Sequence, residues 1–359
     1  MSYRIDCLTD NSPYALDIKR INHLFASLQI NLKNEKLRCQ ITIDLYNLYL
    51  DSVKKPKQAI GIFDKGLKKI FQEYSKKVEK NIKKTNVNLK KINKISIITK
   101  KHYSKLFSSF TNKNIFIEPK KFLMKRLLRN KIDISNFKSK NAIDMGCGIG
   151  RYTFVLKKIG FQKVLGIDFS KTNINFAKKI TSINKIKNVF FKCEDINNLK
   201  QKNEFDFAFS SGSFHHTKSI DKCVKIMKKI LKPQSAGFLF LSHKGGMRWA
   251  VVQLCRNILR HTHSELIYKY FDKALKDPKK IYLILDHILV PINTLTSPKE
   301  VSQIFKKNSI KNFIRLKRGS ETDDIERIHK YKKLLSKKNL FYIYGYGENR
   351  YYFKINEKK

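Results

Sequence analysis

The sequence predicts a doubly wound α/β fold, in which helices cover both faces of a mostly parallel sheet. Short apolar runs, such as those at 163–168 and 205–210, are typical of buried strands, and they alternate with amphipathic stretches of helical period. This alternation implies parallel strands joined by right-handed crossovers. A glycine-rich turn follows the first strand, and acidic residues end the first three. The carboxyl edge of the sheet is therefore the expected place for a ligand.

The first of these strands ends in Asp144 and leads into a turn with glycine at every second position, followed by a helix-like stretch. Glycine permits positive φ and close backbone approach, because it has no Cβ. The first N–H groups of a helix have no partner within it, so a ligand placed there meets donors. The three glycines are Gly146, Gly148 and Gly150. Arg151 stands where the dinucleotide fingerprint G-x-G-x-x-G would have its third glycine, so the turn departs from that fingerprint.

Two further strands end in acids. The run at 163–169 contains Asp168, which is placed to accept hydrogen bonds from both ribose hydroxyls of a nucleoside. A helix cap before Ser170 is the alternative interpretation. The run that starts at Val189 ends in Glu194 and Asp195, and either acid suits the same edge.

The pattern D-x-G-x-G-x-G at 144–150 resembles motif I of the class I S-adenosylmethionine-dependent methyltransferases. The order of features after it is also similar to that family: a strand to Ser211, a His-His pair, an amphipathic helix from about Ser219 to Leu231, a turn at 232–237 and another strand. The resemblance extends over residues 101–355. It implies a seven-stranded sheet and S-adenosylmethionine as the cofactor.

The resemblance also implies individual cofactor contacts. Asp195 would hold the adenine, with Ile196 against the ring and Glu194 as the near rival. Tyr103, in the short segment before the core, would close over the cofactor. The full set implied for cofactor binding is Tyr103, Asp144, Gly146, Gly148, Gly150, Asp168, Phe169, Asp195, Ile196 and Ser211.

His215 and His216 are the candidate catalytic residues, because they follow the fourth strand at the cofactor edge and a histidine can act as a base near neutral pH. The alternative is that His215 shapes the pocket and His216 caps or packs. His243, at the end of the fifth strand, is a further candidate for the rim of the pocket. The chain lacks a Pro-Pro dipeptide and a Pro-Cys pair, which disfavours two subclasses of nucleic-acid methyltransferase. Its six cysteines have no metal-binding spacing, so no metal site is expected.

The two ends of the chain differ from this core. Residues 1–95 are expected to form a helical extension with three amphipathic helices, and 96–359 the methyltransferase domain. Within it, residues 245–308 form an insertion that commonly roofs the acceptor site in the resembled family, where Asp286 and His287 are candidate lining residues. In that family a turn-forming segment, matched here by residues 285–293, precedes a helix that opens with a capping box, matched here by Ser297 and Glu300. The stretch at 344–351, Tyr-Gly-Tyr-Gly-Glu-Asn-Arg-Tyr, resembles the end of a bacterial branch of small-molecule-like methyltransferases.

The net charge of +47 would ordinarily indicate nucleic acid, but its distribution argues against a concentrated footprint. Residues 1–100 hold 21 Lys+Arg against 9 Asp+Glu, and residues 101–359 hold 55 against 20, so the charge per residue is nearly equal. Most of the basic residues are lysine. We interpret the excess as compositional drift.

The leading hypothesis is methyl transfer to a small molecule, a saccharide or a lipid-linked intermediate. RNA methylation and a non-catalytic scaffold with the cofactor fold are the alternatives. The chain shows no signal peptide and no stretch of about 18 apolar residues, so a cytoplasmic protein without a membrane span is expected.

Overall fold

The computed structural model describes residues 11–26, 28, 32–82, 111–133, 137–275 and 278–356. The chain forms two compact units that interleave along the sequence. The helical unit comprises 1–99, 244–290 and 330–345, and the sheet unit comprises 100–243, 291–329 and 346–359. The domain boundaries predicted from the sequence, and the role of 245–308 as a roof, stay predictions.

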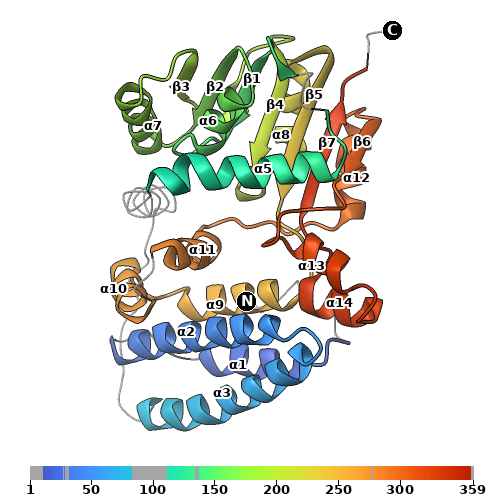
Figure 1. Cartoon of the computed structure of the whole chain (residues 1–359). Helices are drawn as coiled ribbons and strands as arrows, with labels where there is room; N and C mark the ends of the chain where they lie inside the picture. The colour runs from blue at the N-terminus through green and yellow to red at the C-terminus, as the bar shows by residue number, and fades with distance from the viewer. Residues whose placement is uncertain are drawn as a thin grey trace. The chain divides into compact units, whose positions relative to one another are not determined.

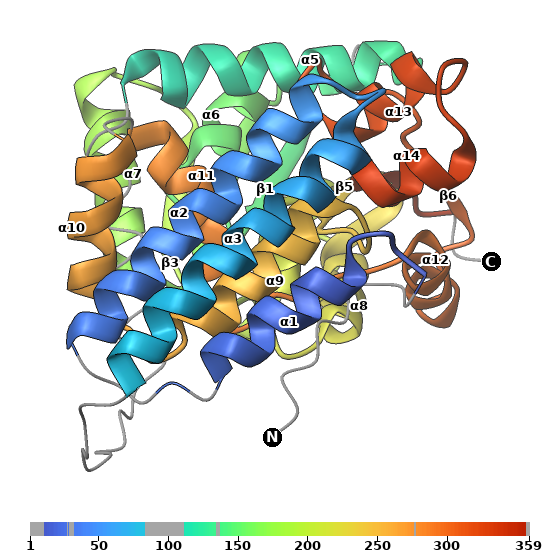
Figure 2. The ribbon, with the colours of Figure 1, turned by 90° about the horizontal axis from the view of Figure 1, so that it is seen from below.

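The helical unit contains the three amphipathic helices predicted near the N-terminus, together with helices that follow the fifth strand (Figure 2). Arg38 joins the two sets, because its buried guanidinium donates to the carbonyl oxygens of Phe25, Leu28 and Ile258 at 3.2, 2.9 and 2.6 Å. Segments far apart in the sequence therefore share one core. The described helices are α1 (Ala15–Ala26), α2 (Leu32–Lys54), α3 (Ala59–Ile82), α9 (Met247–Leu259), α10 (Ser264–Leu275), α11 (Pro278–Ile288) and α14 (Lys337–Tyr344).

The sheet unit is built on seven strands in the order β3-β2-β1-β4-β5-β7-β6 (Figure 1). The pairs from β3 to β5 are parallel, and β7 runs antiparallel to both β5 and β6. This topology confirms the predicted fold. The strands are β1 (Asn141–Met145), β2 (Lys163–Asp168), β3 (Val189–Cys193), β4 (Phe205–Ser211), β5 (Leu231–Leu241), β6 (Asn312–Arg315) and β7 (Asn349–Lys354).

Helices cover both faces of this sheet, and each face has its own apolar core. One core contains residues of α5 and α6, the other residues of α8 and α12. The helices are η1 (Lys113–Ile117), α5 (Glu118–Arg129), α6 (Arg151–Lys158), α7 (Lys171–Ile183), η3 (Ile196–Asn198), η4 (Phe214–His216), α8 (Ile220–Ile230), α12 (Pro298–Lys307) and α13 (Asp324–Tyr331). Burial of both faces explains why the central strands are almost continuously apolar.

Two local expectations differ from the structure. The turn expected at 232–237 lies inside β5, which begins at Leu231. An irregularity in the register between β4 and β5 absorbs it, and Gln234 adopts a positive φ of 58°. Residues 285–288, expected in a turn-forming segment, complete α11. Among the described helices, none is both long and apolar enough to cross a bilayer.

Candidate functional site

The turn after β1 has the conformation that its glycines predict. Gly146, Gly148 and Gly150 have φ of 79°, 55° and 84°, which residues with a Cβ rarely adopt. A Cβ on Gly146 would lie 2.3 Å from the Cβ of Ser213. The absence of side chains therefore leaves the loop backbone bare between β1 and the start of α6.

Asp144 lies directly before this loop and is almost fully buried, with 2% of its surface exposed. The Thr153 hydroxyl donates to Asp144 Oδ2 at 2.7 Å and orients the carboxylate. Burial raises the pKa of Asp144 to about 7. The carboxyl group is thus poised to ionise near neutral pH, which a nearby positive charge would favour.

Asp168 ends β2 and reaches back to the glycine loop. It accepts hydrogen bonds from the backbone N–H of Gly148 at 3.0 Å, from that of Ser170 at 2.9 Å and from Asn173 Nδ2 at 3.4 Å. Burial raises its pKa, although these donors oppose the shift. A carboxylate offers about four acceptor positions, so one remains for a ligand. Asp168 can therefore both cap α7 and bind a ligand. Its Oδ1 accepts hydrogen bonds from the start of α7, and its Oδ2 faces the glycine loop.

The end of β3 presents Asp195 and Ile196. Asp195 is exposed and caps η3, with its Oδ1 accepting from the Asn197 backbone N–H at 2.8 Å. Ile196 is buried, and its Cδ1 lies 3.7 Å from the position of a Cβ on Gly146. The rival acid, Glu194, forms an ion pair with Lys192 at 2.8 Å. Asp195 therefore has the more accessible carboxylate of the two.

Serines tie the end of β4 to the end of β1. The hydroxyls of Ser210 and Ser213 both donate to the Met145 carbonyl, at 3.0 and 2.9 Å. Ser211 ends β4 half-buried, and Phe169 after β2 is 47% exposed. The sheet unit thus brings together the predicted site residues of 144–216 at one edge, while Tyr103 lies outside the described residues.

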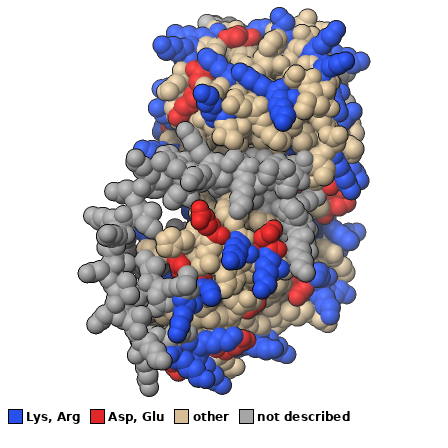
Figure 3. All heavy atoms as spheres, turned by 90° about the vertical axis from the view of Figure 1, so that its left-hand side faces the viewer, with Lys and Arg blue, Asp and Glu red and all other residues tan. Residues whose placement is uncertain are grey.

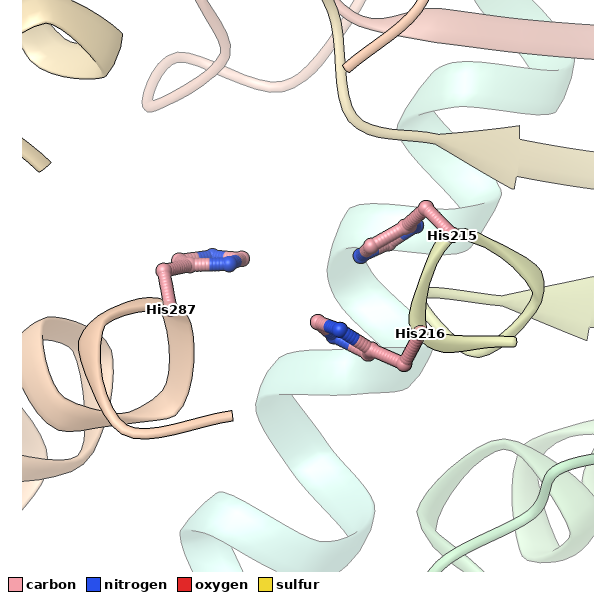
Figure 4. A group of neighbouring side chains, drawn as sticks. All are labelled: His215, His216 and His287. Carbon is pink, nitrogen blue, oxygen red and sulfur yellow. The ribbon is translucent and has the colours of Figure 1, made fainter. Parts of the chain in front are cut away.

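His215 and His216 follow on η4, and their rings lie against each other with centroids 4.2 Å apart (Figure 4). His215 is buried, and its Nδ1 accepts from the Ser242 backbone N–H at 3.4 Å. His216 Nδ1 lies 2.8 Å from the carbonyl oxygen of Ile292. Backbone groups therefore hold both rings. Figure 4 also draws His287, which α11 carries in the helical unit, where its ring lies 4.9 Å from that of Trp249.

A buried network of charges at the same end of the sheet unit was not expected from the sequence. Arg126 donates from Nε and Nη2 to the two oxygens of Asp323, at 2.8 and 2.7 Å, and Arg350 Nη1 lies 3.1 Å from the same carboxylate. Burial alone would raise the pKa of Asp323, but the two arginines hold it well below its usual range. Glu348 accepts from the backbone N–H groups of Asp324 and Ile325, both at 2.9 Å. Residues separated by up to 197 positions meet here, so no local pattern could reveal the network.

Figure 3 shows how the positive charge lies on one face of the molecule. On the described part of the face drawn in Figure 3, lysines and arginines lie among neutral and acidic residues and form no single block. This agrees with the even distribution of charge along the sequence.

Two family models match the chain. One is described as a methyltransferase domain and matches residues 136–310, and the other as a tRNA (Uracil-5-)-methyltransferase and matches residues 7–207. The models overlap over residues 136–207, which include β1 to β3 and most of the predicted cofactor site.

The relatives carry names from two substrate classes. A tRNA/tmRNA (uracil-C(5))-methyltransferase of Campylobacter lari is 30% identical over 195 residues, which are 51% of this chain and 53% of that protein. A ubiquinone biosynthesis O-methyltransferase of Pelagibacter ubique is 33% identical over 102 residues, 28% of this chain and 42% of that protein. A solved S-adenosylmethionine-dependent methyltransferase of Aquifex aeolicus is 16% identical, with 70% of this chain and 98% of that chain covered and a TM-score of 0.40. The chain thus spans only part of the curated relatives it matches.

Proposed function

The chain belongs to the class I S-adenosylmethionine-dependent methyltransferases, and we propose that it methylates a hydroxyl oxygen of a small molecule. The cofactor is S-adenosylmethionine, which supplies an electrophilic methyl group on its sulfonium when bound. What the residues of this chain add is the binding of that group, the orientation of the acceptor and the removal of its proton.

The cradle after β1 fits the cofactor. Its three glycines leave bare backbone, and Asp144 can balance the positive charge of the cofactor as it ionises. We propose that Asp168 accepts from a ribose hydroxyl with its remaining position, and that Asp195 and Ile196 hold the adenine. Phe169 and Ser211 complete the site in this proposal.

The observation that carries the acceptor class is the hydrogen bond between His216 Nδ1 and the Ile292 carbonyl. A carbonyl oxygen only accepts, so Nδ1 bears the hydrogen and Nε2 of the neutral ring has the lone pair. We propose His216 Nε2 as the base that takes the hydroxyl proton, so that the oxygen would displace the thioether sulfur at the methyl carbon and leave S-adenosylhomocysteine and a protonated imidazole. His215 supports the ring of His216 in this proposal.

RNA is the second candidate, and the names of the matching relatives favour it. The enzyme named in those relatives methylates C5 of uracil, a carbon that needs a nucleophile to add to the ring first. Among the described residues, Cys147 is the cysteine in the glycine loop, and burial raises its thiol pKa far from the nucleophilic range. The His pair suits a hydroxyl better. The predicted saccharide and lipid-linked acceptors have no support in these names.

The two acceptor classes are separated by one labelling experiment. Purified protein is incubated with methyl-tritiated S-adenosylmethionine and either the small-molecule fraction or the RNA fraction of a cell extract. We expect label in the small molecules, and its loss by about 100-fold with His216→Gln, which is within the range typical of general bases. Label in RNA alone would replace the first candidate by the second.

Cofactor binding is tested separately by calorimetry without an acceptor. We expect micromolar S-adenosylmethionine affinity, lost in Gly148→Val and retained in His216→Gln. Equal loss in both variants would show that His216 acts on the fold or the cofactor, and it would remove the proposed base.

A further inference from the structure

A short segment at 291–296, which we call the strap, crosses the ends of η4 and β5. The Thr294 N–H donates to the His215 carbonyl at 2.9 Å, and Ile292 accepts from His216. The Thr296 N–H and hydroxyl both donate to the Ser242 carbonyl, at 3.0 and 2.9 Å. The strap therefore touches the backbone or side chain of both histidines and the residue whose N–H holds the His215 ring.

One side chain anchors the strap from the other side. Asn349, the first residue of β7, is fully buried, and its Nδ2 donates to the carbonyl and the hydroxyl oxygens of Thr296, at 2.7 and 3.0 Å. This buried amide holds the strap backbone at Thr296 firmly, because a Thr296 carbonyl left without its hydrogen bond would carry a large desolvation cost. Asn349 belongs to the Glu-Asn-Arg stretch at 348–350 that the sequence singles out, and the proposed reaction leaves its role unassigned.

The strap determines the tautomer of His216, and the neighbouring Ser242 N–H determines that of His215. The Ile292 carbonyl holds the hydrogen of His216 on Nδ1, whereas the Ser242 N–H holds the lone pair of His215 on Nδ1. The neighbouring rings are thus fixed in opposite tautomers. A displacement of the strap removes the acceptor that fixes His216, and an unconstrained ring distributes its hydrogen between both nitrogens.

We infer that Asn349 is a positioning residue, which holds the strap so that His216 keeps its Nδ1–H tautomer and its Nε2 lone pair. The catalytic part of this inference rests on the proposed function. The chain of contacts runs from Asn349 through Thr296 to the strap, and from Ile292 to the imidazole, entirely within the sheet unit.

The primary test measures the tautomer of His216 directly and needs no methyl-accepting substrate. Nitrogen-15 NMR of the full chain resolves the two ring nitrogens of each histidine, and His216→Gln identifies the His216 signals. The variant Asn349→Asp is isosteric and replaces the donor by an oxygen that repels Thr296. We expect wild-type His216 to show Nδ1–H, and Asn349→Asp to show a mixture. An unchanged His216 spectrum in a folded Asn349→Asp protein overturns the inference.

Asn130→Asp is the matched control, because Asn130 Nδ2 likewise donates to two oxygens, here the backbone carbonyls of Arg126 and Arg318. We expect it to lose stability without a change in the His216 signals. Thr296→Val is the second variant if Asn349→Asp does not fold. It removes the hydroxyl bond to Ser242, and a partial change in the His216 tautomer is expected.

Transfer activity separates this inference from the proposed function. With the labelled small-molecule fraction, we expect Asn349→Asp to lower the transfer rate about tenfold at saturating cofactor, with cofactor affinity unchanged. A changed tautomer with unchanged transfer would leave the positioning role standing and would remove His216 as the base. A changed rate that Asn130→Asp reproduces would instead indicate a general loss of order.

Discussion

The two halves of the sheet are held together in different ways. In the cofactor half, β1 to β3, the key bonds join near neighbours in sequence, such as Thr153 to Asp144, 9 residues apart, and Gly148 to Asp168, 20 apart. In the acceptor half, β4 to β7, Asn349 bonds to Thr296 across 53 residues and Arg126 to Asp323 across 197. The cofactor half depends on backbone geometry and on contacts between residues close in sequence. The acceptor half depends on buried side chains that are distant in sequence and that the fold brings together.

This contrast predicts different responses to mutation. Changes in the cofactor half should affect the binding of S-adenosylmethionine first, because bare backbone and the acids Asp144, Asp168 and Asp195 are proposed to contact the cofactor there. Changes in the acceptor half should affect stability first, since buried polar groups left without partners are costly.

The largest expected effect is that of Arg126→Ala in the acceptor half. It leaves the buried Asp323 carboxylate without its bidentate partner, and breaking a buried pair in this way costs about 3–5 kcal/mol of unfolding free energy. Urea unfolding measures it. The control is Lys125→Ala, on the same helix as Arg126, which removes an exposed ion pair with Glu321 and should cost less than about 1 kcal/mol. Equal losses would contradict the assignment of this half to buried charges.

Gly146→Ala tests the cofactor half. The new Cβ meets Ser213 at 2.3 Å and the residue must keep φ of 79°, so we expect a loss of about 2–3 kcal/mol and no detectable cofactor binding. Gly212→Ala is the matched control, because Gly212 has φ of 84° but no atom within 4 Å of its Cβ position. Only the strain, about 1 kcal/mol, should appear there. Calorimetry that finds normal affinity in Gly146→Ala would show that the cradle tolerates a side chain.

The same contrast explains how much the sequence could predict. Asp144 and the glycine turn lie within a few residues of each other, and Asp168 and Asp195 end the next strands, so their arrangement at one edge follows from the rule for parallel sheets. The mostly parallel sheet was predictable from the alternation of strands and helices, whereas the strand order, in which β4 lies beside β1, was not predicted.

The acceptor half was less predictable because its contacts are distant in sequence. Nothing local to Arg126 indicates Asp323, and nothing local to Thr296 indicates Asn349. The one available signal was the Glu-Asn-Arg stretch at 348–350, whose last two residues start a strand that continues with Tyr-Tyr-Phe. Charged residues are rarely buried unless they are paired. The stretch therefore indicated that partners exist, but it did not indicate which residues they are. The capping box at Ser297 and Glu300 was predictable, since it spans only three residues.

Asp144→Asn tests the cofactor half through the pH dependence of S-adenosylmethionine affinity. The pKa of about 7 lies above the usual value of 3.8, so the protonated form prevails in the free protein at pH 6 and the carboxylate at pH 8. Because the carboxylate attracts the positively charged cofactor, we expect affinity to rise up to about tenfold between these values, and to stay flat in Asp144→Asn.

Folding stability should show the opposite trend for Asp144. A raised acid pKa means that the native state binds the proton more tightly, so its contribution to stability is full below pH 3.8 and is lost as the pH rises toward 7. In Asp144→Asn this decline should be absent from the unfolding free energy.

The affinity measurement can contradict the proposed role of Asp144. A wild-type affinity that does not change between pH 6 and 8 would show that Asp144 does not face the cofactor charge.

The smallest expected losses of unfolding free energy come from removing one helix cap in each half. In Ser297→Ala, α12 loses the donor bond from the Glu300 N–H at 3.3 Å and the hydroxyl bond to Glu300 Oε2 at 2.8 Å, which should cost about 1 kcal/mol. In Ser170→Ala, α7 loses one long bond from the Asn173 N–H at 3.4 Å, so about 0.5 kcal/mol is expected. Urea midpoints measured side by side decide the order. Because Ser297 directly follows the strap, only Ser297→Ala should also broaden the His216 signals; broadening in Ser170→Ala would mean that the two halves are mechanically coupled.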